Sequence, residues 1–228
     1  MQILVEQFGD FEDCLNKQNV STKYFTHIIG DNGGICVEVS TGKILFRREI
    51  KKDKLERIIE EYIKIGGDIS NIRLTNGKNV IAHNNVKARE YYRDSQEVIY
   101  RDNITQIEDG MTKLTLTGNK IQIKKMMQFI EENMPGIRVH KGRSTYPEGK
   151  SKHFRIDITG NYDKGTAAEE LIDALEIDRC IYLGDDLNDV PMFRKGLQNN
   201  DFIIVANSKE HEVTESVVSE LQEEMRTN

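Results

Sequence analysis

The stretch that decides the fold is residues 163–189, DKGTAAEELIDALEIDRCIYLGDDLND. Residues 164–176 carry apolar side chains at helical spacing, and residues 180–183 form a short apolar run. Such a run is typical of a strand buried in a parallel sheet. A further helical segment and a second apolar run, residues 202–206, follow. This alternation predicts βαβ units and therefore a doubly wound parallel sheet.

An acidic loop follows the first of these strands. It reads Gly184-Asp185-Asp186-Leu-Asn-Asp189 and lies at the carboxyl end of the strand, where doubly wound sheets bind ligands. Carboxylate oxygens are the ligands that Mg²⁺ prefers, so the loop is a candidate metal site. The alternative is a solvated loop that caps the next helix with an aspartate.

Lys164 is the second candidate, because it lies at the first turn of the helix over residues 164–176. A lysine there opposes the helix dipole, so local helix stability does not explain it. Its ammonium group is suited to a phosphate or carboxylate beside the metal. The alternative is an ordinary surface lysine.

The preceding part of the chain has a different texture. Helical spacing over residues 51–65 and after residue 119 alternates with strand patterns at 35–39, 43–50, 112–117, 137–141 and 153–158. This mixture predicts an inserted α+β domain. We expect a core domain over residues 1–34 and 160–228, and a second domain over residues 35–159.

Together, the DKG and GDDLND motifs and the Pro191-Met-Phe segment resemble the haloacid dehalogenase superfamily. Within it the chain is similar to Cof-type phosphatases with a type IIB cap, whose cap begins after a turn like Asp31-Asn-Gly-Gly. The resemblance covers nearly the whole chain and is strongest over residues 163–193. It implies an α/β core with an inserted α+β cap domain.

The resemblance also implies roles for single residues. Lys164 would steady the nucleophile and the transferring phosphoryl group, Asp185 would bind Mg²⁺ directly, and Asp189 would orient Lys164 or a metal-bound water. Asp186 would be a weaker metal contact. The expected substrate contacts are Asn32, Asn188, Asn207 and, in a basic loop over residues 142–152, Arg143.

One part of the family pattern is missing from this sequence. The family needs an aspartate nucleophile and a second aspartate in a DxDxT motif on the first core strand, and no Asp-x-Asp triplet occurs in the chain. The core is therefore expected to be incomplete at its N-terminus. We expect either that Gln2 to Val5 fill the gap of the missing central strand, or that another chain or a second copy covers it, because unpaired edges are costly.

Two functions remain open at this point. The first is a Mg²⁺-dependent phosphatase acting on a small phosphorylated metabolite such as a sugar phosphate, with its nucleophile motif missing from this chain. The second is a non-catalytic relative that binds a phosphorylated ligand or serves as a regulatory or interaction protein. Losing the nucleophile favours the second function, and keeping Lys164, Asp185 and Asp189 favours the first.

Composition excludes other classes. The 228 residues carry a formal net charge of -6, which argues against nucleic acid as a partner. No apolar run of membrane-spanning length and no signal-peptide pattern occurs, so we expect no membrane association. The three cysteines are widely spaced, which is typical of reduced thiols in a cytoplasmic protein.

Overall fold

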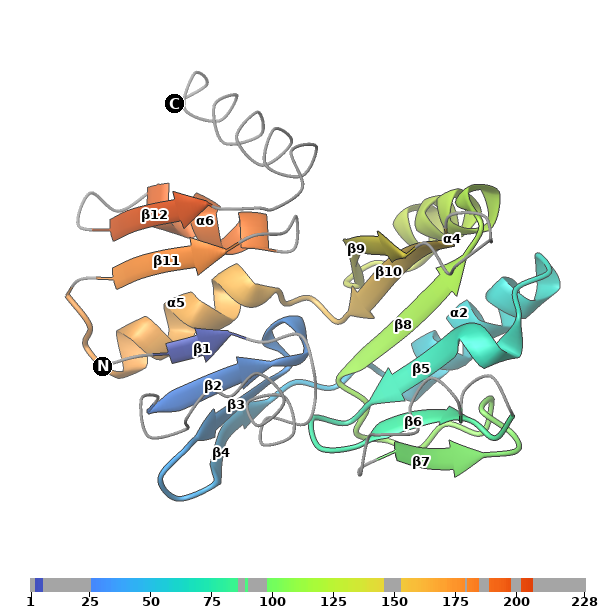
Figure 1. Cartoon of the computed structure of the whole chain (residues 1–228), viewed down its shortest axis with the longest axis horizontal. Helices are drawn as coiled ribbons and strands as arrows, with labels where there is room; N and C mark the ends of the chain where they lie inside the picture. The colour runs from blue at the N-terminus through green and yellow to red at the C-terminus, as the bar shows by residue number, and fades with distance from the viewer. Residues whose placement is uncertain are drawn as a thin grey trace.

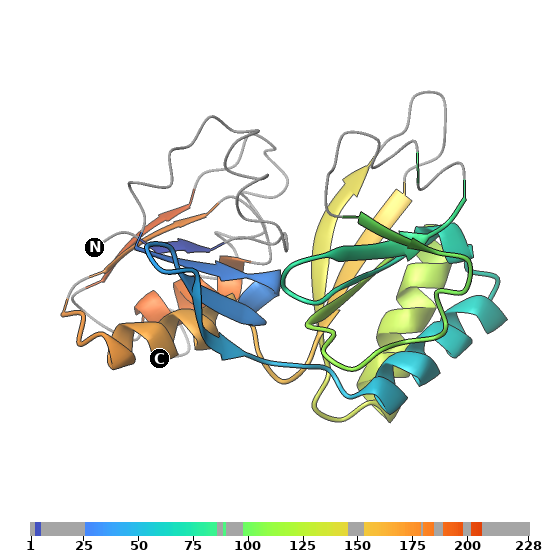
Figure 2. The ribbon, with the colours of Figure 1, turned by 90° about the horizontal axis from the view of Figure 1, so that it is seen from below.

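A computed structural model describes the protein over residues 3–5, 26–85, 89, 98–145, 153–178, 180–184, 189–197 and 202–206. For residues 3–5, 143–145, 180–184, 196–197 and 202–206 the description is limited to the backbone. The elements form two groups that lie side by side (Figure 1). The chain passes between the groups twice, through residues 48–51 and 160–163 (Figure 2).

The first group contains two sheets. One has the strand order β1-β2-β3-β4, in which β1 runs parallel to β2 and the other neighbours are antiparallel. The other pairs β11 with β12 in parallel, as expected from the two apolar runs. The strands are β1 (Ile3–Val5), β2 (His27–Gly30), β3 (Ile35–Glu38), β4 (Lys43–Arg47), β11 (Cys180–Gly184) and β12 (Phe202–Ala206).

Two helices, α5 (Lys164–Ala174) and α6 (Val190–Leu197), belong to this group and pack against each other. The apolar face of α5, which includes Ala167 and Leu171, meets Phe193 of α6 and Ile29 of β2 in one hydrophobic core. The α/β class with parallel strands in the core is therefore confirmed.

The second group is a six-stranded sheet with the order β7-β6-β5-β8-β10-β9. Helices α2 (Lys52–Lys64) and α4 (Lys120–Asn133) lie side by side on one face of it (Figure 2). The strands are β5 (Ile72–Thr75), β6 (Val80–His83), β7 (Val98–Arg101), β8 (Lys113–Gly118), β9 (Arg138–Thr145) and β10 (His153–Thr159).

The helical periodicity of α2 explains how it packs. Leu55, Ile58, Ile59 and Tyr62 fall on one stripe and are fully buried against the sheet. Ile63, which the sequence pattern also placed on this stripe, is 39% exposed. It lies about 140° round the helix from Ile58 and therefore at the outer edge of the buried stripe.

The two faces of the six-stranded sheet differ because side chains alternate along a strand. On β8 and β10, Leu114, Leu116, Ile156 and Ile158 face the helices and join the hydrophobic core. The residues between them are polar and face the other way: Lys113, Thr115, Thr117, Arg155 and Asp157. The sheet therefore turns one polar face away from its helices.

The expected domain boundary at residue 35 needs a correction. β3 and β4 pair with β2 in the first sheet, so the hairpin over residues 35–47 belongs to the first group. The chain leaves that group only through residues 48–51. The turn at Asp31 reverses the chain within one sheet, because Gly30 and Ile35 pair directly across it.

β1 does not fill the place of a missing central strand. Among the described strands, β1 pairs only with β2, and β11 pairs only with β12. Of the two expected ways to complete the sheet, filling of the gap by the first residues is wrong for the described part of the chain, and cover by another chain or a second copy stays a prediction. Within that part, no helix has the length and apolar character needed to cross a membrane.

Candidate active site

Lys164 and Asp189 form a buried ion pair at the start of α5. The Nζ atom of Lys164 donates to Oδ1 of Asp189 at 2.6 Å. Both residues are only 6% exposed. The carboxylate offsets the unfavourable position of a lysine at a helix N-terminus. Along the chain, only four residues separate Asp189 from the carboxyl end of β11.

The first turn of α5 is fixed by its neighbours. Asp163 caps the helix by accepting from the backbone N–H of Thr166 at 2.8 Å, and Thr166 bonds back to Asp163 in a capping box. Arg138 of β9 forms an ion pair with Asp163. A Cβ on Gly165 would lie 2.3 Å from the carbonyl oxygen of Pro191, so only glycine lets α6 approach this closely.

A tight turn next to α5 carries Asp31 and Asn32. Both have left-handed backbones, with φ of 51° and 54°, and both side chains are fully buried. Such conformations are costly for residues with a side chain and are frequent at functional sites. Gly33 has φ 97°, and a Cβ there would lie 2.3 Å from the carbonyl oxygen of Asp163. The turn therefore packs directly on the N-terminus of α5.

Asn32 reaches across to the polar face of the second sheet. Its Nδ2 lies 3.5 Å from Oδ2 of Asp157, which is 1% exposed. Asp157 also accepts from Thr115 at 2.6 Å and from Nε and Nη2 of Arg155, at 2.7 to 3.1 Å. The carboxylate is therefore held by partners from both groups of elements.

Asp31 makes a second contact at this junction, by which we mean the region where the Asp31–Asn32 turn meets the polar face of the second sheet. Lys113 lies with Nζ 3.2 Å from Oδ1 of Asp31, and Thr112 donates to its other oxygen. Lys113 is only 2% exposed. A charge pair buried this deeply is costly to break, because either partner alone would be a desolvated charge.

Burial and neighbouring charges shift the pKa values of Asp157 and His140 in this region. Burial raises the pKa of Asp157, but Arg155 and Lys113 outweigh it and hold that pKa at about 2. Burial lowers the pKa of His140 to about 4, and the attraction of Asp157 opposes this shift only in part. His140 is therefore neutral at pH 7, and its Nε2 lies 2.9 Å from Oγ1 of Thr159.

A sequence profile of the haloacid dehalogenase-like hydrolases matches residues 8–215. The chain belongs to the haloacid dehalogenase-like hydrolase family. This confirms the resemblance stated from the sequence motifs. No curated protein sequence matches the chain.

Solved structures of haloacid dehalogenase-like proteins have the same fold. One such hydrolase from B. subtilis superposes with a TM-score of 0.69 at 13% identity, covering 95% of this chain and 79% of that chain. A protein from Streptococcus mutans gives 0.63 at 16% identity, covering 96% and 85%. A phosphatase of the superfamily from Bacteroides thetaiotaomicron gives 0.62 at 14% identity, covering 97% and 80%.

The structure locates only some of the haloacid dehalogenase residues named from the sequence. Lys164 and Asp189 are brought together, and Asn32 lies at the junction with the second sheet. Arg143 lies within β9 rather than in the expected loop, because β9 continues to Thr145. Only the backbone of Arg143 is described. Asp185, Asp186, Asn188 and Asn207 lie outside the described residues. Among those described, no three His, Cys, Asp or Glu side chains gather as a metal site.

Other residues at the junction were not singled out from the sequence. Lys113, Thr115 and Asp157 are buried and polar, and they share one face of β8 and β10. The sequence does alternate between polar and apolar residues along residues 112–117 and 153–158. It predicted strands, but a strand pattern alone does not say that its polar face will be buried.

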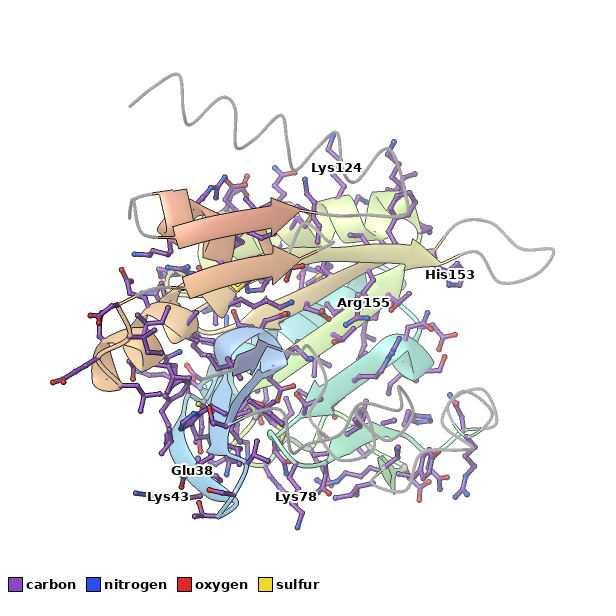
Figure 3. The ribbon with its side chains drawn as sticks, turned by 60° about the vertical axis from the view of Figure 1, so that its left-hand side comes forward. Glu38, Lys43, Lys78, Lys124, His153 and Arg155 are labelled. Carbon is purple, nitrogen blue, oxygen red and sulfur yellow. The ribbon has the colours of Figure 1, made fainter. Side chains whose placement is uncertain are left out.

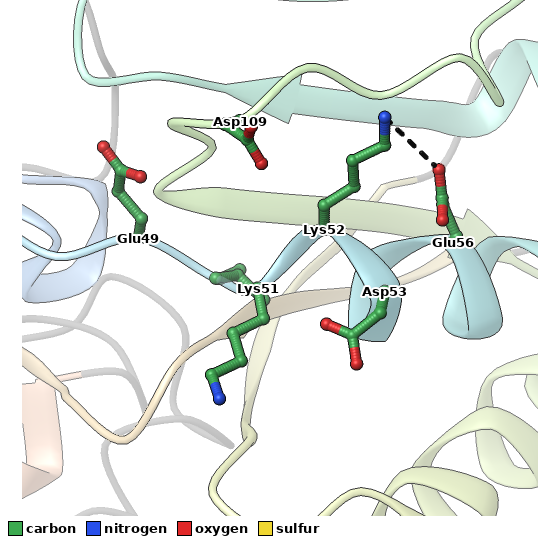
Figure 4. A pocket seen from close by; sticks show the side chains of 7 residues that line it. Glu49, Lys51, Lys52, Asp53, Glu56 and Asp109 are labelled. Carbon is green, nitrogen blue, oxygen red and sulfur yellow. Dashed lines mark ion pairs between the residues drawn. The ribbon is translucent and has the colours of Figure 1, made fainter.

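A hollow of about 530 Å³ lies beside the first passage between the two groups (Figure 4). Lys52 pairs there with Glu56, with Nζ and Oε1 3.8 Å apart. Its charged lining residues are Glu49, Lys51, Lys52, Asp53, Glu56 and Asp109. Four carboxylates against two ammonium groups repel a phosphate, so this hollow does not compete with the Lys164 region as the candidate phosphate site.

Proposed function

We propose that the chain is part of a Mg²⁺-dependent phosphatase that acts on a small phosphorylated metabolite such as a sugar phosphate. The observation that carries this proposal is the buried Lys164–Asp189 pair at the N-terminus of α5, in a haloacid dehalogenase-like fold. A fixed ammonium group and the N–H groups of a helix start both attract phosphoryl oxygens. Lys164 would hold the phosphate, and Asp189 would keep its ammonium group oriented.

The residues that precede Asp189 in the sequence have the chemistry of a magnesium site. Asp185 and Asp186 follow β11 directly in the sequence, and together with Asn188 they offer only oxygen ligands. They would hold the ion, with Asp185 as the direct ligand. When bound, Mg²⁺ supplies neutralisation of the phosphate charge and orients the phosphoryl group.

The nucleophile motif of the family must come from outside this sequence, because the sequence has no Asp-x-Asp triplet. We propose that it is carried by a strand that inserts between β1 and β11. Each of these strands has a partner on only one side among the described strands, and both belong to parallel pairs. A further parallel strand would pair both edges and continue one sheet from β12 to β4.

The second group of elements would act as the cap that selects the substrate. Its polar face meets Asp31 and Asn32 through Lys113 and Asp157. Asn32 and the polar face would contact the part of the metabolite beyond the phosphate. Arg143, Asn188 and Asn207 are proposed as further contacts.

The test is turnover of p-nitrophenyl phosphate with and without Mg²⁺. In the protein that contains its nucleophile strand, isolated from its source with any partner chain retained, we expect magnesium-dependent release of phosphate and its loss in Asp185→Ala and Lys164→Met. Asp178→Ala is the matched control, because Asp178 is an exposed carboxylate outside the site, and it should retain full activity.

Absence of magnesium-dependent turnover in the protein that contains its nucleophile strand would overturn the catalytic proposal, and turnover by the 228-residue chain alone would overturn the proposal that the nucleophile is supplied from elsewhere. If inorganic phosphate then still bound in the presence of Mg²⁺, and Asp185→Ala removed this binding, the chain would be a ligand-binding relative of the enzymes. Circular dichroism of each variant shows whether a loss reflects the site or the fold.

A further inference from the structure

A pocket opens on the helix-covered side of the second sheet, away from the junction that holds Asp31 and Asn32. It lies between α4 and the strands β9 and β10, and its volume is about 680 Å³. Cavities of this size are typical of small-molecule sites. We call it the α4 pocket. Figure 3 labels Lys124 on α4 and Arg155 on β10. Both residues contribute to the pocket lining, but the guanidinium group of Arg155 binds Asp157 on the other face of the sheet.

The pocket arises because α4 does not reach the edge of the sheet. α4 contacts β8 and β10, whereas β9 is the outermost strand. The floor is therefore made of apolar side chains at the margin of the core: Ile123 and Met127 from α4, and Phe154 and Ile156 from β10. Met127 and Phe154 are only partly buried, so apolar surface remains accessible.

Lysines surround one end of this apolar floor. Lys120 and Lys124 are four residues apart on α4 and lie on the same side of the helix. Lys141 of β9 is paired in register with Ile156, so its side chain is on the helix-covered face. All three are exposed, and none pairs with a carboxylate among the described residues.

The charged residues that line the pocket are distributed unevenly along it. Glu131 is its one acidic lining residue and lies about two turns along α4 from Lys124. The cationic end is therefore at Lys120, Lys124 and Lys141, in a chain whose net charge is -6. An anionic head group would be attracted to this end, and an apolar body would cover the floor.

We propose that the α4 pocket binds a small amphiphilic anion, with an apolar chain or ring on Ile123, Met127 and Phe154 and an anionic head group between Lys124 and Lys141. The pocket lies on the opposite face of the sheet from Asp157. The proposal therefore does not depend on the phosphatase activity, and it adds a second ligand site to the chain.

The test is isothermal titration of the full chain with decanoate and with decanesulfonate, neither of which is a phosphate ester. Both are used below the concentration at which they form micelles, and decyl glucoside is the uncharged comparison. We expect saturable binding of both anions at one site and much weaker binding of the glucoside. Lys124→Glu should weaken anion binding roughly five- to tenfold, because an attraction becomes a repulsion.

Lys125→Glu is the matched control, since Lys125 is the exposed neighbour on the same helix and does not line the pocket. It makes the same change in net charge and should alter the dissociation constant less than twofold. Equal weakening by both variants, an unchanged affinity in Lys124→Glu, equal binding of the glucoside, or no saturable binding would each overturn the proposal. Both positions are exposed, so neither variant should unfold the protein.

Discussion

Lys164 occupies a position that local helix energetics disfavour and that the tertiary structure stabilises. At the first turn of a helix its charge is locally unfavourable, and a free surface lysine there would be solvated. In the structure its ammonium group is buried and bonded to Asp189. The ammonium group of Lys164 is therefore held in place at a helix N-terminus, a position suited to binding a phosphoryl group.

Removing this ammonium group should destabilise the fold as well as abolish activity. Lys164→Met removes the ammonium group that Asp189 binds inside the protein, and the expected cost is about 3–5 kcal/mol of unfolding free energy. The double variant Lys164→Met/Asp189→Leu should be more stable than the single variant, because no charge remains buried. Urea unfolding measures the unfolding free energy of the double variant and of the single variants Lys164→Met and Asp189→Leu. If the double variant lost the sum of the two single losses, the pair would not be coupled.

His140 predicts a pH dependence of stability. Its pKa falls from the usual 6.5 to about 4 on folding, so the unfolded state binds more protons between these values. Stability should be complete above pH 6.5 and decrease by up to about 3 kcal/mol as the pH falls towards 4. Urea unfolding between pH 4 and 7 measures this slope, and His140→Asn should reduce it. An identical slope in that variant would contradict the assignment to His140.

At the scale of the elements, two glycines determine how closely the parts of the site approach. Gly33 lets the Asp31 turn contact the first turn of α5, and Gly165 lets α6 contact the same turn from another side. Both contacts are with backbone atoms, which cannot rotate away as a side chain can. The motifs that contain these glycines therefore have a packing function besides any chemical one.

Gly165→Ala should destabilise the protein although alanine is the better helix former. Its Cβ would lie 2.3 Å from the carbonyl oxygen of Pro191, and the expected cost is about 1–3 kcal/mol. Thermal unfolding measures it. Gly42→Ala is the comparison, because nothing lies within 4 Å of its Cβ and only its φ of 68° is strained. A stabilised Gly165→Ala would show that α6 can move away freely.

At the scale of the whole molecule, buried polar contacts hold the two groups of elements together. Lys113 and Asp157 of the second sheet meet Asp31 and Asn32 of the turn beside α5. Tyr162, in the second passage, places its hydroxyl within hydrogen-bond distance of the carbonyl oxygens of Arg48 and Thr112. Both passages are therefore tied to the same junction.

Breaking the Lys113–Asp31 pair should loosen this junction. Lys113→Met leaves Asp31 buried and unpaired, and we expect a loss of about 3–5 kcal/mol together with faster tryptic cleavage near Arg48 and Lys51. Lys78→Met is the control, since Lys78 is exposed (Figure 3), and its cleavage rate and stability should match the wild type. Unchanged cleavage in Lys113→Met would show that the pair does not hold the two groups together.

Much of the fold could be predicted because its elements carry local patterns. The helical spacing of residues 51–65, the alternation over residues 112–117 and the apolar runs of β11 and β12 each reflect the periodicity of one element. The boundary at residue 35 could not be predicted this way. A turn followed by a hairpin has the same local pattern whether the hairpin continues the first sheet or begins another domain.

The sequence by itself determined the elements, the family and the two motifs that contain Lys164 and Asp189. Only the tertiary structure decided which polar residues are buried together. Lys113, Asp157 and His140 look like the solvated face of ordinary strands, and Asp31 looks like an ordinary turn residue. They become one buried network because the polar face of the second sheet meets the Asp31 turn and α5, and such a long-range contact leaves no periodic signal in the chain.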